Sequence, residues 1–255
     1  MSATEVPAQQ APVLALEKRE PETLAKAAWR RFRRHRMAMV GAVLLLGLAV
    51  YIVAGSLIFS EADANHNDVT IRYQTPSAEH CFGTDEIGRD VLARTIYGGQ
   101  ISLLIGTIAA LISVIVGTLV GALTGYFGGW LDSILMRITE AMLTIPQIFL
   151  LLVMSKFFGN KIADIKFLGR TFSGSVIVII VIIGATSWMY LARIVRSTYL
   201  SLREQEFVTA AHCLGVTTPR IIFIHILPNA MAPIIVAATL GVANAIITEA
   251  YISFL

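Results

Sequence analysis

The feature that most constrains this chain is a succession of long apolar runs. A helix needs about 20 apolar residues to cross the hydrocarbon core of a bilayer. Runs of that kind begin near residues 37, 101, 133, 174 and 230. Because a backbone in lipid must satisfy its own hydrogen bonds, these runs predict an all-α polytopic membrane protein with five transmembrane helices.

Composition supports this class and excludes others. Of the 255 residues, 56% are hydrophobic and only 15% are charged, which leaves no room for a large soluble core. The two cysteines, Cys81 and Cys213, form no CxxC pair, so neither a disulfide framework nor a zinc site is predicted. The histidines lie scattered over different segments: His35, His66, His80, His212 and His225. We therefore predict no catalytic, cofactor-binding or metal site.

The first 36 residues predict a cytoplasmic basic tail. The cluster from Trp29 to Arg36 could bind nucleic acid if it stood alone, but the apolar run 37–59 follows it directly. Placed before a span, such a cluster keeps the N-terminus in the cytoplasm, with Trp29 and Phe32 at the lipid headgroups. The run is too long for the core of a cleaved signal peptide.

Residues 60–97 are polar and predict the first extracytoplasmic loop. They carry seven acids against three arginines. The group Asp85, Glu86, Arg89 and Asp90 could be taken for a hydrolytic carboxylate pair. Without further catalytic machinery nearby, we expect a turn held by ion pairs and glycine geometry.

Two spans carry informative small or rigid residues. In the run 101–126, Gly117, Gly121 and Gly125 recur every four residues, a spacing that lets membrane helices approach closely. After a short turn at residues 128–132, the next helix extends from about residue 133 to 158. Pro146 is expected to kink or break that helix and expose backbone that could line a translocation path.

Charges near the helix ends bear on topology. Arg137 and Glu140 stand at i and i+3, and an ion pair at the interface is favoured over a proton relay. The loop 156–173 is basic although the number of crossings places it outside. More Lys and Arg still lie on the predicted cytoplasmic side, including Arg193 and Arg196 after the run 174–192, so the orientation is kept.

A polar island, residues 204–229, lies between the last two apolar runs. Phe207, Ala210, Ala211 and Leu214 recur at i, i+3, i+4 and i+7, which predicts a short amphipathic helix. Its apolar face is too small to hold a domain together, but it suits a groove on another protein.

The end of that helix predicts an elbow. Gly215 is expected at the position after the helix, where a positive φ is needed. Thr218 and Pro219 then supply an N-cap and a first-turn proline for a second helix. Glu206 favours the start of the first helix through its dipole.

At this point the residues resemble a known family, the membrane subunits of ABC importers. Their cytoplasmic loop carries Glu-Ala-Ala, three residues, Gly, nine residues and Ile-x-Leu-Pro, and Ala210-Ala211, Gly215 and Leu227-Pro228 match this spacing. Thr209 and His225 depart from the pattern. The variant His-Ile-Leu-Pro-Asn, which ends at Asn229, is similar to the peptide and nickel branch.

Two further stretches strengthen the resemblance. Residues 83–103 are similar to the corresponding segment of peptide-importer permeases almost residue for residue. Residues 249–255 resemble the family's Glu-Ala-x-Leu-Ser-Phe-Leu, after which the family has glycines and a sixth helix. We expect a sixth helix to be missing from the chain as given.

The resemblance implies a type I permease fold, with residues 98–255 as the permease core and residues 197–229 as its cytoplasmic coupling loop. It implies partners: two ABC ATPase subunits that bind ATP and Mg, a second homologous permease subunit and an extracytoplasmic substrate-binding protein. The residues it places in ATPase coupling are Glu206, Phe207, Ala210, Ala211, Leu214, Gly215, Pro219, Leu227 and Pro228.

The resulting expectation is a non-catalytic, multi-pass subunit of a prokaryotic cell membrane that translocates di- or oligopeptides by alternating access. A nickel or other small-solute importer stays open as an alternative. A secondary transporter, the rival from another class, usually has ionisable groups at the membrane midplane and inverted repeats, and neither is evident here. No nucleic acid partner is expected.

Overall fold

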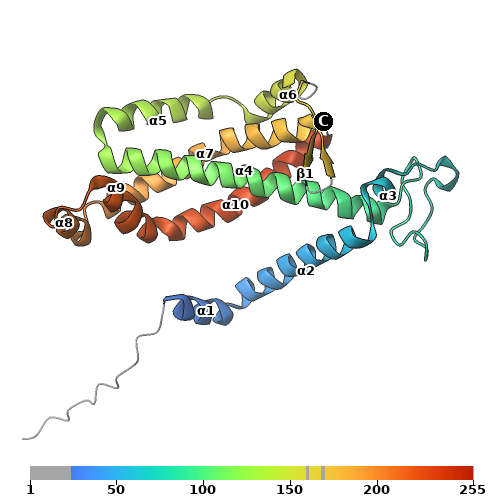
Figure 1. Ribbon diagram of the computed structural model, residues 1–255, viewed down its shortest axis with the longest axis horizontal. Coiled ribbons are helices and arrows are strands. Elements are labelled where there is room, and N and C mark those ends of the chain that lie inside the picture. Colours follow the sequence, from blue (N-terminus) through green and yellow to red (C-terminus); the bar gives the residue numbers. More distant parts are fainter. Residues whose placement is uncertain (1–23, 159–160, 168–169, 255) are drawn as a thin grey trace, which may run out of the picture. The chain divides into compact units, whose positions relative to one another are not determined.

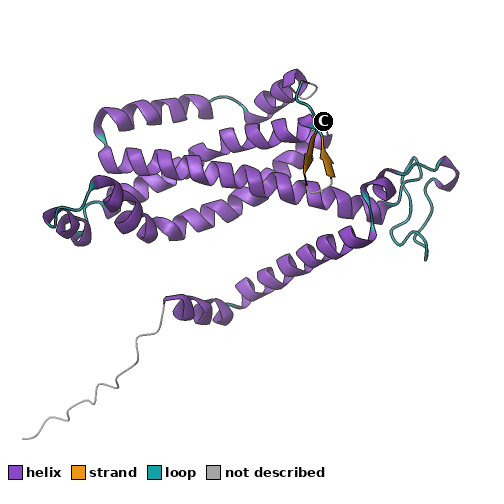
Figure 2. Cartoon of the chain, viewed as in Figure 1, coloured by secondary structure: helices purple, strands orange, loops and turns teal. Residues whose placement is uncertain are grey.

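The computed structural model describes residues 24–158, 161–167 and 170–254. Most of these residues are helical (Figures 1 and 2). Residues 1–23 of the predicted basic tail lie outside the described residues. The chain forms two compact units, of which the first ends at Leu57 and the second begins at Ile58.

The first unit consists of two consecutive helices, α1 (Leu24–Arg34) and α2 (Arg36–Ile58). His35 separates them, and its Nδ1 accepts a hydrogen bond of 3.1 Å from the backbone N–H of Ala38. This side chain satisfies one of the amide groups that the start of a helix leaves unpaired. Helix α2 coincides with the predicted first span.

The second unit opens with a polar segment that contains α3 (Glu61–Asn65) and the 3-10 helix η1 (Val69–Ile71). Its turn is held as the sequence predicts. The Asp85 carboxylate accepts from Arg89 Nε at 2.7 Å and from backbone N–H groups. Gly83 and Gly88 take positive φ values of 73° and 78°. Burial raises the pKa of the Asp85 carboxyl. The surrounding backbone N–H groups and the Arg89 guanidinium lower it by more, so the pKa of Asp85 lies below its usual value.

Helix α4 (Val91–Phe127) and helix α7 (Gly174–Leu202) form the centre of this unit. The Asp90 side chain caps the backbone N–H of Ala93 at 3.0 Å, so α4 begins ten residues before the predicted run. Gly117, Gly121 and Gly125 face α7 as expected. A Cβ on Gly121 would meet the carbonyl oxygen of Ala192 at 2.5 Å, so only hydrogen fits there.

The predicted helix 133–158 is broken at Pro146. Helix α5 (Gly129–Leu143) and helix α6 (Gln147–Phe158) meet at a bend of 80°. The turn before α5 uses positive φ at Gly128 and Gly129. Asp132 in the first turn of α5 accepts two hydrogen bonds from the Arg196 guanidinium of α7, at 2.5 and 2.6 Å. This bidentate pair fastens α5 to the centre of the unit.

A small hairpin follows, with strands β1 (Ile165–Phe167) and β2 (Arg170–Phe172) paired antiparallel. No pattern in the sequence predicts this hairpin. The last helix, α10 (Leu227–Phe254), packs on α4 and α7. Within it Glu249 is buried, and the hydroxyls of Ser102 on α4 and of Ser253 donate to its two oxygens at 2.9 and 2.8 Å.

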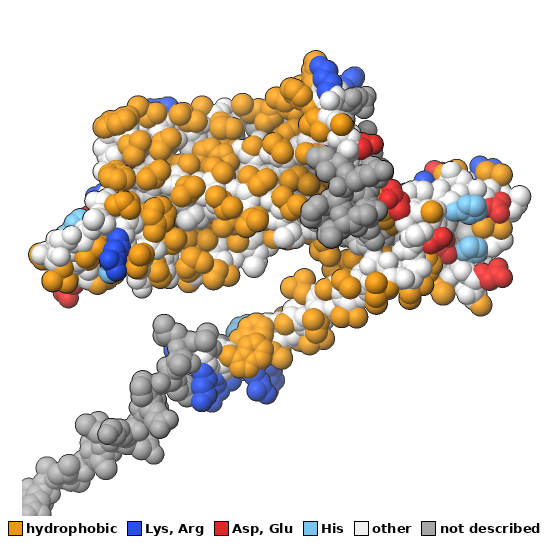
Figure 3. Space-filling view, in the orientation of Figure 1, with side chains coloured by type: hydrophobic (Ala, Val, Ile, Leu, Met, Phe, Trp, Pro, Cys, Tyr) orange, Lys and Arg blue, Asp and Glu red, His pale blue; other side chains and the backbone are white. Residues whose placement is uncertain are grey.

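The fold class predicted from the sequence is confirmed. Among the described residues, four helices are long and apolar enough to cross a membrane, and the bent pair α5–α6 makes five if it counts as one span. Hydrophobic side chains cover the outside of the helices (Figure 3). A surface of this composition is stable against lipid or another protein and not against water. The Arg137–Glu140 pair also forms, at 3.4 Å between exposed side chains.

The contact between α4 and α7 generates a stability prediction. We expect Gly121→Ala to destabilise the protein by about 1–3 kcal/mol, because the added methyl group must displace backbone of α7. The measurement is the thermal unfolding of the purified protein in detergent.

Gly47→Ala is the matched control, since a Cβ at Gly47 in α2 would meet nothing within 4 Å. It should unfold at or above the wild-type temperature. Equal effects of the two substitutions would contradict close packing at Gly121.

Candidate functional site

The polar island folds as the predicted elbow, at one end of the helices of the second unit (Figure 1). Helix α8 (Glu206–Cys213) ends at Leu214, and Gly215 reverses the chain with φ of 72°. The positive φ predicted for Gly215 is therefore confirmed. The helix restarts as α9 (Thr218–Arg220), with Thr217 at the N-cap and Pro219 in the first turn, one residue earlier than expected.

Helix α8 has an inner and an outer face, and the structure divides the predicted docking residues between them. Val208 and Ala211 are buried in a cluster with residues of α7 and α10. Phe207 and Leu214 are 39% and 83% exposed, and Ala210 is exposed with them.

Our placement of Ala211 on the outer face is therefore wrong. The inner stripe of α8 is Val208 and Ala211, at i and i+3, and it packs against this chain's own core. We had not included Val208, the residue that completes this stripe. The outer surface is formed by Phe207, Ala210 and Leu214, and Glu206 is exposed at its start.

Helix α8 is fastened to the ends of two long helices. Tyr126 Oη at the end of α4 lies 3.2 Å from His212 Nε2. Arg203 donates to the carbonyl oxygen of Tyr126 at 3.2 Å. The buried Tyr199 on α7 donates through Oη to the carbonyl oxygen of Ile222 at 3.1 Å. Helix α8 is therefore joined to α4 through the Tyr126–His212 contact and to α7 through the core cluster that contains Val208 and Ala211.

The sequence could not reveal these partners. Tyr126 and His212 are 86 positions apart, and no short-range pattern relates them. The remaining two predicted coupling residues also lie away from the outer surface of α8. They follow the π-helix η2 (Ile221–Ile226): Leu227 packs on the core cluster and Pro228 is exposed at the start of α10.

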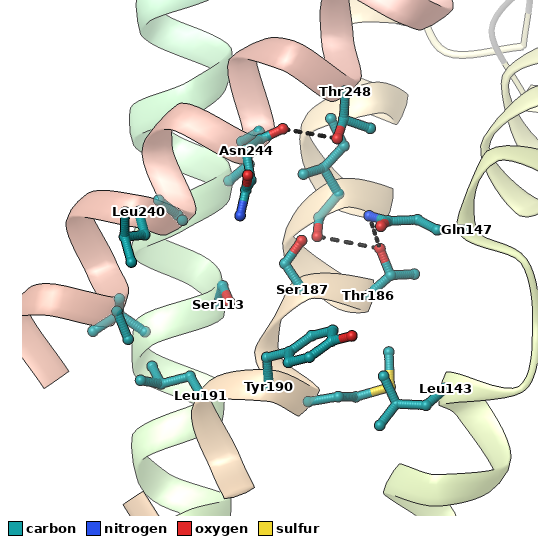
Figure 4. Close-up of a pocket in the computed structure, with 18 of the residues that line it drawn as sticks. Ser113, Leu143, Gln147, Thr186, Ser187, Tyr190, Leu191, Leu240, Asn244 and Thr248 are labelled. Atoms are coloured by element: carbon teal, nitrogen blue, oxygen red, sulfur yellow. Dashed lines mark hydrogen bonds between the residues drawn. The ribbon is translucent and has the colours of Figure 1, made fainter. Parts of the chain in front are cut away.

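A second candidate site is a cavity of about 570 Å³ beside the broken helix. It is lined by residues of α4, α5, α6, α7 and α10. Its polar side chains converge from different helices (Figure 4): Ser113, Gln147, Thr186, Ser187, Tyr190, Asn244 and Thr248. Gln147 Nε2 donates to Thr186 Oγ1 at 3.0 Å, which ties the start of α6 to α7.

The cavity is uncharged, and its polar side chains lie among mostly apolar ones. No Asp, Glu, Lys or Arg is among the described residues that line it. A neighbouring cavity of about 590 Å³ between α5 and α7 shares Tyr190 and Ile194 with it and adds Glu140, Arg193 and Arg196. Together they form a hydrogen-bonding chamber next to a charged region. Within the described part of the chain, no three His, Cys, Asp or Glu residues are grouped to hold a metal.

Long apolar helices that surround a cavity with polar side chains define a polytopic helical membrane protein. Two family profiles match the sequence. Residues 117–255 match the binding-protein-dependent transport system inner membrane component, and residues 23–76 match the N-terminal transmembrane domain of oligopeptide transport permease C.

Curated proteins are similar over most of this chain. The dipeptide transport system permease protein DppC of Bacillus subtilis is 39% identical over 238 residues, which cover 93% of this chain and 70% of that protein. The oligopeptide transport system permease protein OppC of Escherichia coli K12 is 40% identical, over 92% of this chain and 74% of that protein. The chain belongs to the family of type I ABC importer permeases to which these proteins belong.

Gly215 gives a prediction about the elbow itself. A Cβ at Gly215 would meet nothing within 4 Å, so its φ of 72° is the only obstacle to substitution. We expect Gly215→Val to cost about 1–3 kcal/mol locally and to speed hydrogen exchange of the Val216 amide, which now donates to Ala211 at 3.1 Å.

Gly215→Asn is the control, because asparagine tolerates this backbone region. It should exchange at close to the wild-type rate. Equally fast exchange in both variants would show that the effect of a substitution depends on the space around Gly215 and not on its φ.

Proposed function

We propose that this chain is the transmembrane permease subunit of an ATP-driven importer of di- or oligopeptides. The proposal is supported by the relatives, whose names are dipeptide and oligopeptide transport system permease proteins. The chamber fits such a substrate, because peptide amides need hydrogen-bond partners and the chamber offers amide and hydroxyl groups.

In this proposal the chain catalyses no reaction. Two ATPase subunits bind ATP and Mg and hydrolyse the nucleotide. A second homologous permease completes the membrane part, and an extracytoplasmic binding protein delivers the peptide.

The elbow is the proposed contact with the ATPase subunits. The observation that carries this step is the exposure of Leu214 and Phe207 on a helix whose other face packs on the core cluster and whose His212 contacts Tyr126 of α4. An apolar side chain at such a position is stable when another protein covers it. Movement of α8 would then shift α4 and α7 around the chamber and alternate its access between the two sides of the membrane.

Leu214→Arg tests this contact. We expect at least a tenfold loss of affinity for the ATPase subunits, because a charge replaces the most exposed apolar side chain of α8. Dipeptide uptake in proteoliposomes should fall with it, while the permease still inserts and folds. The measurements are ATPase co-purification and uptake of a labelled dipeptide. Ala211→Arg is unsuitable, since it would disrupt the core of this chain.

The matched control is Val69→Arg, which places the same charge on an exposed apolar residue of the polar segment before α4. It should co-purify with the ATPase subunits as the wild type does. If Leu214→Arg also bound them normally, the elbow would not be the docking surface.

We further propose that the N-terminus is cytoplasmic in the cell membrane of a prokaryote. The two exposed cysteines report on this orientation. In intact cells a membrane-impermeant thiol reagent should label Cys81, whereas Cys213 should react only after permeabilisation.

Single-cysteine variants, Cys213→Ser and Cys81→Ser, make the two signals separable. Labelling of Cys213 in intact cells would reverse the proposed orientation.

A further inference from the structure

Helix α1 segregates basic and aromatic side chains on different faces. Lys26, Arg30 and Arg33 recur at i, i+4 and i+7 and share one face. Trp29 and Phe32 share another, and their rings stack with centroids 5.6 Å apart. At the N-terminal end of the described chain, Figure 3 shows blue Lys and Arg groups next to orange hydrophobic ones. A helix with Lys and Arg on one face and Trp and Phe on another favours the plane of a membrane interface.

The charge of this segment is not balanced within it. Residues 26–36 contain six Lys and Arg, and the sequence from Leu24 to Ser60 contains no Asp or Glu. Each of these cations attracts anionic lipid when it is held near a membrane surface. The guanidinium groups of the arginines can form bidentate hydrogen bonds with phosphate oxygens.

Helix α1 directly precedes a helix that is long and apolar enough to span a membrane. His35 ends α1 and caps α2, and α2 is the span that follows at once. A helix joined to the end of a span by one residue cannot leave the headgroup region. Because the helix is interrupted at His35, the axis of α1 need not continue that of α2, and α1 can lie along the membrane surface.

We propose that α1 is a binding site for anionic phospholipid headgroups, with its arginines on the phosphates and Trp29 and Phe32 inserted at the boundary of the acyl chains. This goes beyond the role of basic residues in setting topology, which acts while the chain inserts. The site described here selects anionic over zwitterionic lipid in the mature protein.

Trp29 supplies the probe. In the full chain carrying Trp130→Phe and Trp188→Phe, Trp29 is the remaining tryptophan. This protein is reconstituted in phosphatidylcholine bilayers that contain a small fraction of either brominated phosphatidylglycerol or brominated phosphatidylcholine. Bromine near the top of the acyl chains quenches an interfacial indole by contact.

At equal mole fraction, brominated phosphatidylglycerol should quench Trp29 more strongly than brominated phosphatidylcholine. The preference should fall at least about tenfold when Arg31, Arg33 and Arg34 are all replaced by Gln, because each basic residue contributes separately. It should also weaken in high salt, which screens exposed charges.

The matched control replaces the same three arginines by Lys, which keeps the charge and should keep most of the preference. Lys26, Arg30 and Arg36 remain in both variants to hold the topology, which Cys81 and Cys213 labelling verifies. Equal quenching by the two lipids in the wild type would overturn the proposal. So would a preference that the change to Gln leaves undiminished, since the lipid would then bind elsewhere. The readout needs no transport, so it is independent of the proposed function.

Discussion

The close contact between α4 and α7 is the constraint on which the rest of the second unit depends. Apolar side chains in lipid are already out of water, so the hydrophobic effect does not drive membrane helices together. These helices associate through packing and hydrogen bonds. Three glycines in successive turns of α4 bring its backbone against α7. That contact places Tyr126 at the end of α4 beside α8, and Tyr199 of α7 beneath the π-helix. It also sets the wall of the chamber, because Ser113 and Thr186 come from these two helices.

Polar groups inside this unit attach the other helices to the α4–α7 pair, whereas the glycines hold that pair together. The Asp132–Arg196 pair holds α5 on α7, Gln147 holds the start of α6 there, and Glu249 joins α10 to α4 through Ser102. Each of these bonds joins one peripheral helix to the α4–α7 pair. The break at Pro146 lies between two of them, so the chamber is bordered by a bend whose two arms are separately fastened.

Much of this arrangement can be predicted from the sequence, because lipid imposes a simple rule on helix length. The spans, the glycine contact, the break at Pro146 and the positive φ of Gly215 follow from residue type and spacing alone. Helix ends were harder, because Asp90 caps α4 before its apolar run begins and α7 continues to Leu202, past the predicted end at residue 192. The orientation of Ala211 was wrong because a periodicity of small residues does not say which face another segment covers. Tyr126, Arg203 and the residues that line the chamber depend on contacts between distant segments, which sequence spacing does not encode.

In the proposed importer, the outer surface of α8 meets the ATPase subunits while its inner surface stays bound to this chain. Hydrogen–deuterium exchange of the reconstituted permease, with and without the ATPase subunits, tests it directly. We expect the amides of residues 206–215 to become protected when the ATPase subunits bind, whereas those of residues 61–90 exchange as before. Unchanged exchange in residues 206–215, with the ATPase subunits demonstrably bound, would contradict it.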